Sequence, residues 1–377
     1  MNFSRTKIGW VLSGSDVVPG ARIQGFNAQV ELHSMGVESE ILIAPRKYSL
    51  SVSESETDWK SWIKRGFTTI VFQKVFAGDA VRLVGELRNA GIRTVYMACD
   101  LCGHNMVDAC DVTIAVSSFL KKMFGRRRAG KIQVVPDGLE VSADKPKQQY
   151  RFIGTSPVKA VYVGSAFPSP EVLGMLAVLE QKVDLTIIAS RYEPHLDISD
   201  ASISATSAIS KLEEIWKCHP LDILEKALRK CVYVGRSFRG RVSAVSQGDL
   251  QHRFVEWDKN TVATAIVEHD VALIPAFLAS DHDMAKSSNR LTMFMALGMP
   301  VIASPVPSYT EIVRNGENGF IAGSRADWLN ALQKLTEPGI AERIGQCARA
   351  NVIETFSLKR TVETYLAVFR GDTIAAS

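Results

Sequence analysis

Lys286 and Arg290 have the residue type and the spacing that point most directly to chemistry. They flank the start of a helix predicted over residues 289–297, within the stretch DMAKSSNRLTMF. A helix N-terminus carries unpaired backbone N–H groups and a partial positive charge, so two cations are favourable there only beside an anion. We therefore expect both side chains to hold a phosphate. Asn289, in the same turn, is either a third ligand or a simple cap.

The elements around these cations alternate between strands and helices. Strands are predicted at 271–275 and 301–303, and Gly298 suits the end of the helix between them. The sequence Ser308-Tyr-Thr-Glu311 is a capping box that predicts a second helix, which accounts for Glu311 unless its carboxylate contacts the ligand. This order indicates a doubly wound α/β sheet, which binds ligands beyond the carboxyl ends of its strands.

The same alternation fills the rest of the chain and implies parallel sheets. In the first half, strands are predicted at 8–12, 40–44, 69–73, 92–98, 112–116 and 132–135, and helices at 21–35, 59–65, 79–90 and 118–124. Elsewhere in the second half, strands are predicted at 158–163, 184–189 and 254–256, and helices at 210–230, 260–268, 325–335 and 340–354. The pattern predicts an N-terminal domain over 1–140, a polar linker over 141–157 and a C-terminal domain over 158–355.

The last stretch, 356–377, predicts an amphipathic helix with Val362, Tyr365, Leu366 and Phe369 on one face. An apolar face of this kind needs burial, so we expect the helix to cross back onto the N-terminal domain.

The composition is that of an ordinary globular protein with two domains. The chain has 377 residues and a net charge of +4, too small to argue for nucleic acid as a partner. Its six cysteines form no disulfide-like framework and its N-terminus shows no signal peptide, so we expect a cytoplasmic protein. The arginine triplet at 126–128 is either a solvated face or a contact with an anionic membrane surface at the inner face.

Other candidate site residues follow predicted strands. Asp100 comes after the strand at 92–98, at the carboxyl end where such sheets bind ligands. Gly164 and Ser165 end the strand at 158–163, where a diphosphate can approach the backbone closely. Four possible zinc ligands lie close together in the sequence: Cys99, Cys102, His104 and Cys110. Their spacing lacks the second Cys-x2-Cys or His pair that a zinc site needs. We therefore predict no metal site.

Several longer stretches match a known pattern: PGARIQGFNAQVELHSMGVESEI, ACDVTIAVSSFLKKMF, KIQVVPDGLE, DVALIP, NRLTMFMALGMPVIAS and EIVRNGENG. They resemble the retaining, nucleotide-sugar-dependent GT-B glycosyltransferases, a family that includes glycogen-synthase-like and bacterial surface-polysaccharide enzymes. The resemblance implies two Rossmann-like doubly wound domains that face a central cleft. It also implies metal-independent transfer from a nucleotide diphosphate sugar, without a cofactor, to a glycan or lipid-linked acceptor in cell-surface polysaccharide or glycoconjugate synthesis.

The resemblance also implies roles for the candidate residues. The catalytic candidates are Asp100, Lys286 and Arg290. The donor-binding candidates are Gly164, Ser165, Lys286, Asn289, Arg290 and Glu311. The acceptor or sugar side would carry Gly20, Arg22 and His104.

The chain departs from the family at several donor positions. The family usually carries two glutamates with seven residues between them, where this chain has Ala285 and Met293. It often carries Arg and Lys after the first strand of the second domain, where this chain reads Gly164-Ser165. Two alternatives therefore stay open. One is a nucleotide-sugar epimerase, and the other is a non-catalytic GT-B protein that binds a glycan or a partner enzyme.

Overall fold

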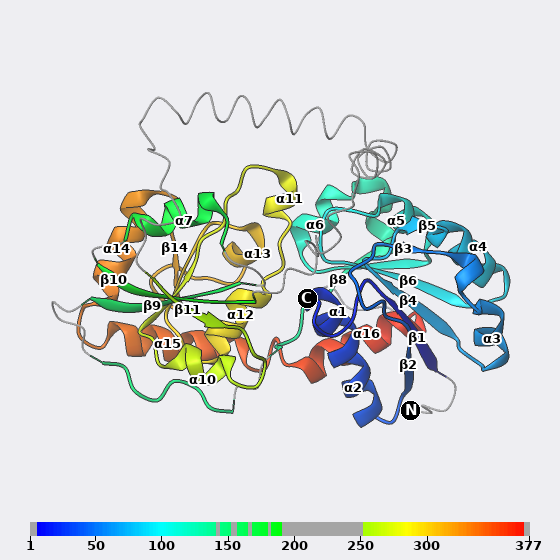
Figure 1. Ribbon diagram of the computed structural model, residues 1–377, viewed down its shortest axis with the longest axis horizontal. Helices are drawn as coiled ribbons and strands as arrows, with labels where there is room; N and C mark the ends of the chain where they lie inside the picture. The colour runs from blue at the N-terminus through cyan, green and yellow to red at the C-terminus, as the bar shows by residue number, and fades with distance from the viewer. Residues whose placement is uncertain are drawn as a thin grey trace, which may run out of the picture.

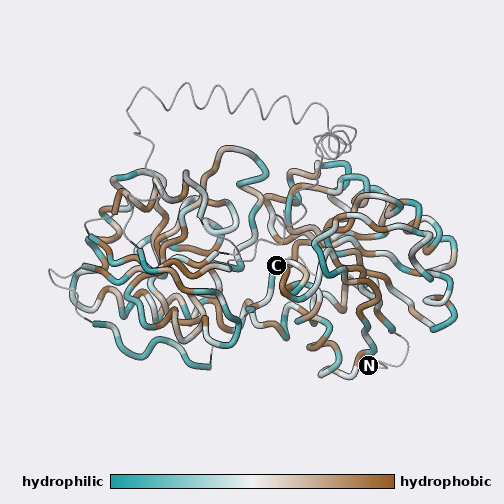
Figure 2. Tube along the Cα trace, viewed as in Figure 1, coloured by the Kyte–Doolittle hydropathy of each residue, from teal (hydrophilic) through white to brown (hydrophobic). Residues whose placement is uncertain are grey.

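The computed structural model describes residues 6–140, 144–151, 157–164, 168–179, 182–190 and 252–372. Within them the chain forms two lobes, each built on a six-stranded parallel sheet with helices on both faces (Figure 1). Apolar strands gather inside each lobe and hydrophilic loops surround them (Figure 2). The predicted helix at 210–230 and the candidate ligand Ser165 lie outside the described residues.

The sheet of the first lobe has the strand order β2-β1-β4-β6-β7-β8, with every pair parallel. Along the chain these strands are β1 Lys7–Leu12, β2 Glu38–Ile43, β4 Thr69–Gln73, β6 Arg93–Ala98, β7 Val112–Ala115 and β8 Ile132–Val134. A separate short parallel pair joins β3 Ser51–Val52 to β5 Ala77–Gly78.

Helices cover both faces of this sheet. One face packs against α3 Trp59–Lys64, α4 Ala80–Asn89, α5 His104–Ala109 and α6 Ser118–Met123. The other face packs against α2 Asn27–Ser34 and the C-terminal helix α16 Leu358–Arg370. Two short 3-10 turns complete the lobe, η2 Glu54–Glu56 and η3 Arg126–Lys131.

Helix α16 lies at the end of the chain yet packs on the first lobe (Figure 1). The rings of Trp10 and Phe369 meet edge to face with their centroids 5.6 Å apart. Thr69 Oγ1 donates to the Phe369 carbonyl oxygen at 3.2 Å. Val362, Tyr365 and Leu366 are buried beside them. The apolar face read from the sequence is therefore buried against the strands of the first sheet.

The helix predicted over 21–35 is interrupted by a wider turn. It starts as α1 Pro19–Ala21, continues as a π-helical segment, η1 Arg22–Phe26, and returns to α-helical geometry in α2. The predicted helix is confirmed through Ser34, but its π-helical turn was not expected, because an apolar repeat does not reveal a single extra residue in one turn. The wide turn carries Arg22 and Gln24, which are polar and yet only 8% and 1% exposed.

The sheet of the second lobe has the order β11-β10-β9-β12-β13-β14, again all parallel. Counted along the chain, this is the order 3-2-1-4-5-6 of dinucleotide-binding folds. The strands are β9 Val158–Gly164, β10 Val183–Ala189, β11 His252–Glu256, β12 Val271–Ile274, β13 Val301–Ala303 and β14 Phe320–Ile321.

Helices also cover both faces of the second sheet. One face packs against α10 Val262–Val267, α12 Asn289–Ala296 and α15 Ile340–Val352. The other face packs against α7 Pro170–Ala177 and α14 Arg325–Leu335. Two short helices, α11 Asp281–Met284 and α13 Pro307–Thr310, lie in the loops after β12 and β13.

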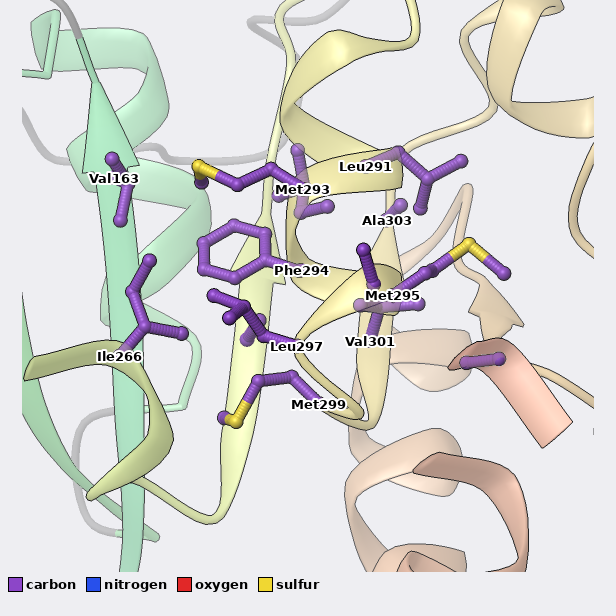
Figure 3. Packing of buried hydrophobic residues seen from close by; sticks show 14 of the residues in the cluster. Val163, Ile266, Leu291, Met293, Phe294, Met295, Leu297, Met299, Val301 and Ala303 are labelled. Atoms are coloured by element: carbon purple, nitrogen blue, oxygen red, sulfur yellow. The ribbon is translucent and has the colours of Figure 1, made fainter. Parts of the chain in front are cut away.

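Helix α12 is almost wholly buried, which explains its apolar sequence. Phe294, Leu297 and Met299 point toward Ile266 and the sheet, as Figure 3 shows. Gly298 ends the helix with a φ of +74°, a conformation that favours glycine, as its position in the sequence predicts. The core thus holds α12 in place and fixes the direction of its first turn.

Candidate active site

A cleft of about 1120 Å³ lies between the two lobes. Its lining includes Lys74 directly after β4 and Gly164 at the end of β9, together with Ser13 after β1 and Pro275 after β12. In each sheet the order of the strands reverses beside the first strand, and α/β sheets bind ligands in the crevice at such a point. The topology therefore brings two crevices face to face.

Seven candidate residues from the sequence meet in this cleft. From the first lobe they are Gly20, Arg22 and Asp100, and from the second lobe Gly164, Lys286, Asn289 and Arg290. We call the first-lobe side, made by Gly20, Arg22, Lys74, Asp100, Asp137 and Glu140, the first wall. The second wall is made by Gly164, Trp257, Lys286, Asn289, Met293 and Arg290.

Arg290 occupies the first turn of α12 and is enclosed by two tyrosines. Its guanidinium lies 5.3 Å from the centre of the Tyr162 ring and is hydrogen-bonded to the Tyr162 side chain. Tyr309 approaches it from α13. Within the described ranges, no carboxylate forms an ion pair with Arg290. An enclosed guanidinium without a counter-ion is a ready site for an anion.

Lys286 lies on the same wall, on the loop before α12, and its backbone is held in place. The Ser308 hydroxyl donates to the Lys286 carbonyl oxygen at 2.8 Å, and Ala285 is fully buried in the core of the first lobe. The Lys286 side chain is 45% exposed, and its Nζ lies 3.5 Å from Asp100 Oδ1. Its backbone is therefore held while its ammonium group can still move.

The capping box predicted at Ser308 and Glu311 was wrong. Helix α13 begins at Pro307 after the N-cap Val306, and Glu311 is an exposed residue at its C-terminal cap. Proline at the first helical position fixes φ, so it starts the helix ahead of Ser308. Glu311 does not line the cleft, and its donor-binding role stays a prediction.

Asn289 opens helix α12 on the cleft side. Its backbone N–H donates to Ser287 Oγ at 3.4 Å. Its side-chain oxygen is buried and has no hydrogen-bond partner among the described residues. A buried polar atom normally has a partner, and a ligand in the cleft would supply one. Gly164 lies on the same wall, where the backbone of β9 ends.

Asp100 follows β6 and is paired with Lys74 of its own lobe and with Lys286 across the cleft. Burial alone would raise the pKa of Asp100, but Lys74 and then Lys286 outweigh it, and the pKa falls to about 2. Such a carboxylate stays ionised at neutral pH and is a weak proton acceptor. It is suited to accept hydrogen bonds from sugar hydroxyls rather than to transfer a proton.

The sequence analysis did not identify Lys74. Among the described residues it is the one non-glycine residue with a positive φ, at 59°. A signal was present, because Lys74 directly follows β4 at the point where the first sheet reverses its order.

Arg22 is held on all sides. Its Nη2 lies 2.5 Å from Glu140 Oε1, with both side chains about 10% exposed. Its guanidinium also lies 4.5 Å from the centre of the Trp257 ring of the second lobe. Gly20 precedes it in a close contact, because a Cβ atom there would lie 3.1 Å from Gln73 Nε2. Arg22 is thus already paired before any ligand arrives.

A buried polar network lies beside these pairs. Ser13 Oγ donates to Gln73 Oε1 at 2.8 Å, Gln73 Nε2 donates to Gln24 Oε1 at 3.0 Å, and Gln24 Nε2 donates to Asp137 Oδ1 at 2.9 Å. The network reaches the second lobe through a hydrogen bond from Ser287 to Asp137. Burial raises the pKa of Asp137 in spite of these hydrogen bonds. Asp137 and Glu140 follow β8 in the stretch KIQVVPDGLE, and the sequence analysis assigned neither carboxylate a role.

His104 does not line the cleft. Its ring packs edge to face against Phe124, with centroids 5.1 Å apart. Burial raises the pKa of the Cys102 thiol to about 11 and also raises that of Cys99, so the metal-binding thiolate forms are disfavoured. No cluster of three His, Cys, Asp or Glu side chains in the described ranges is placed to hold a metal ion. None of the described helices has the length and apolar character that a membrane crossing requires.

One sequence family matches part of the chain. Residues 218–337 match the family described as glycosyl transferases group 1. No curated protein sequence matches the chain significantly.

Solved structures match nearly the whole chain at low identity. Sucrose-phosphate synthase from Thermosynechococcus elongatus is 14% identical with a TM-score of 0.63, and the match covers 97% of this chain and 98% of that one. Anabaena Alr3699/HepE in complex with UDP and glucose is 14% identical with a TM-score of 0.59, covering 97% and 99%. The fold is GT-B.

A further GT-B neighbour is WaaG, a glycosyltransferase involved in lipopolysaccharide biosynthesis. It is 13% identical with a TM-score of 0.56, and the match covers 97% of this chain and 100% of that one. The predicted fold class, two Rossmann-like domains facing a cleft, is therefore confirmed.

Proposed function

We propose that this protein transfers a sugar, with retention of configuration, from a nucleotide diphosphate sugar to a glycan or a lipid-linked acceptor. The observation that carries the proposal is Arg290, an enclosed cation in the cleft without a carboxylate partner in the described residues. The match of residues 218–337 to glycosyl transferases group 1 supports it. GT-B neighbours whose structures contain UDP or UDP-glucose support the class of donor.

In this proposal the second wall holds the diphosphate. Arg290 and Lys286 stabilise the charge that develops on it when the sugar leaves, together with the N–H groups of the first turn of α12. The buried Asn289 side-chain oxygen is an acceptor, so in this proposal it takes a hydrogen bond from a hydroxyl of the donor rather than from the diphosphate. These contacts need no metal ion. On the first wall, the ionised Asp100 accepts hydrogen bonds from hydroxyls of the transferred sugar or the acceptor.

We also propose a cytoplasmic enzyme of polysaccharide or glycoconjugate synthesis that rests against an anionic membrane surface. The cations Lys122, Arg126 and Arg127 are exposed on α6 and η3, whereas Arg128 is paired with Asp108. Each cation near such a surface contributes about 1 kcal/mol. Replacing the three exposed cations by glutamine should reduce sedimentation with phosphatidylserine vesicles and leave nucleotide binding unchanged.

A thermal-shift screen of nucleoside diphosphates and their sugars tests the function. A ligand at one hundred times its Kd should stabilise the protein by about 2.7 kcal/mol. The result should be the same with a chelator present. If no nucleotide shifts the melting temperature, the non-catalytic alternative is correct. An epimerase would instead convert the donor sugar itself, without any acceptor.

A further inference from the structure

Lys74 holds a backbone conformation that ordinary residues avoid. Its φ of 59° lies in the left-handed region, where a Cβ atom crowds the following carbonyl. Its N–H donates to the Met97 carbonyl oxygen at 3.0 Å, which ties this conformation to the sheet. Strain of this kind persists mainly at functional sites, where the surrounding structure enforces it. The strained backbone directs the Lys74 ammonium group toward Asp100.

That ammonium group pairs with Asp100. The other carboxylate oxygen of Asp100 lies 3.5 Å from Lys286 Nζ, so one carboxylate stands between two lysines from opposite lobes. The lysines differ in freedom, since the Lys74 side chain is 20% exposed and the Lys286 side chain 45%. Lys74 is the fixed partner of Asp100 and Lys286 the movable one.

Few other groups can balance the charge of Asp100. The neighbouring Cys99 and Cys102 thiols have raised pKa values and stay neutral. Asp137 nearby is acidic, and His282 on α11 is a further basic group of the described residues that acts on Asp100. Without Lys74, Lys286 would become the main counter-ion of Asp100.

We propose that Lys74 is a positioning residue that neutralises Asp100, so that Lys286 can leave this carboxylate for the diphosphate of the donor. The proposal rests on the proposed function. Lys286 exchanges one anion for another when the donor binds, and Asp100 keeps a counter-ion throughout. Lys74 therefore promotes anion binding on the second wall without touching the anion.

Calorimetric titration with UDP and with inorganic pyrophosphate tests this, at constant ionic strength. Lys74→Met should weaken both affinities by about fivefold to tenfold, an ordinary coupling between two sites. Lys74→Arg keeps the charge and should retain most of the affinity. Asp100→Asn should bind as tightly as the wild type or tighter, because Lys286 then has no competing carboxylate.

The double variant decides between coupling and direct contact. If Lys74 acts through Asp100, then Lys74→Met should have no further effect in the Asp100→Asn background. An equal loss in both backgrounds would mean that Lys74 acts on the anion directly and would overturn the proposal. Unchanged affinity in Lys74→Met would overturn it as well.

The failure of the proposed function would look different. In that case the wild type would bind neither UDP, nor another nucleoside diphosphate, nor pyrophosphate. If Lys74→Met does not fold, Asp100→Asn alone still tests the exchange, since weaker binding in that variant contradicts it.

Discussion

Both walls of the cleft carry cations, but the cations of the two walls differ in whether they are paired with carboxylates. On the first wall Arg22 is paired with Glu140 and Lys74 with Asp100. On the second wall Arg290 pairs with no carboxylate among the described residues, and Lys286 reaches Asp100 only at 3.5 Å. Both of these first-wall cations thus have carboxylate partners within the fold, whereas Arg290 has none among the described residues and is available to an anion.

Because of this difference, we expect the cations of one wall to contribute to stability and those of the other to anion binding. A buried cation that is paired with a carboxylate stabilises the fold, because its removal leaves that carboxylate buried without a counter-ion. An unpaired cation in a cleft contributes little to the fold and much to the binding of an anion. The same substitution on the two walls should therefore affect different properties of the protein.

The largest effect is expected for Arg22→Ala. It leaves the buried Glu140 carboxylate unpaired and should lower the free energy of unfolding by about 3–5 kcal/mol. Urea unfolding measures this. Arg65→Ala is the matched control, because Arg65 pairs with Glu40 at a site where both side chains are more than 40% exposed. That control should lose less than about 1 kcal/mol. Equal losses in the two variants would remove the distinction between the walls.

Met293→Glu tests the apolar part of the second wall. Met293 is 4% exposed and extends toward Val163 in the core (Figure 3). An unpaired carboxylate there should destabilise the protein by about 3 kcal/mol. Met293→Leu should cost less than about 1.5 kcal/mol. A gain in nucleotide affinity without a loss of stability would show instead that the position faces a ribose.

Arg290→Ala should act on affinity rather than stability. Nucleoside diphosphate binding should weaken by about 1.5–3 kcal/mol, the range for hydrogen bonds to charged groups. The urea midpoint should stay the same or rise, since no carboxylate loses its partner. Arg314→Ala, at a cation 62% exposed, is the control and should change neither property. A fall in stability with unchanged affinity would place Arg290 in the fold and the diphosphate elsewhere.

The free energy of unfolding at acid pH should depend on the ion pairs that Asp100 forms. Its pKa of about 2 lies below the ordinary value of 3.8, so the folded protein favours the ionised form. The corresponding stabilisation, about 2 kcal/mol, is present above about pH 4 and is lost as the pH falls toward about 2. Asp100→Asn should lack this part of the pH profile in urea unfolding. If the wild type and Asp100→Asn lost the same stability as the pH falls, the pairing of Asp100 would be contradicted.

The smallest effect is expected for Glu311→Ala. Glu311 is exposed and does not line the cleft, so stability should change by no more than about 0.5 kcal/mol. Nucleotide affinity should be unchanged in the same titration used for Arg290. A tenfold or greater loss would restore its predicted role in donor binding.

Local signals predicted elements of the second lobe well. The limits of β13 and α14 match the prediction, and Gly298 ends α12 as expected, because strands, caps and left-handed glycines depend on neighbouring residues. The capping box at Ser308 and Glu311 failed because Pro307, one residue before Ser308, set the start of the helix. Lys286, before α12, and Arg290, in its first turn, line the same cleft as expected, because they share one short stretch of sequence.

The first wall was harder to predict, because tertiary contacts create it. The π-helical turn at Arg22 and the left-handed Lys74 have no signature in neighbouring residues. The partner of Arg22 is Glu140, more than a hundred residues away in the chain. Pairs of this kind become visible only when the strand order is known.

The position of α16 has a consequence for how the protein is made. Strand β1 is translated long before α16, the helix that covers it. The bond between Thr69 and Phe369 joins residues 300 positions apart, and contacts of such separation form slowly. A nascent chain therefore exposes the apolar face around Trp10 until α16 has left the ribosome, a period in which it is open to aggregation and to chaperones. The sheet of the first lobe is thus translated well before the helix that completes its core.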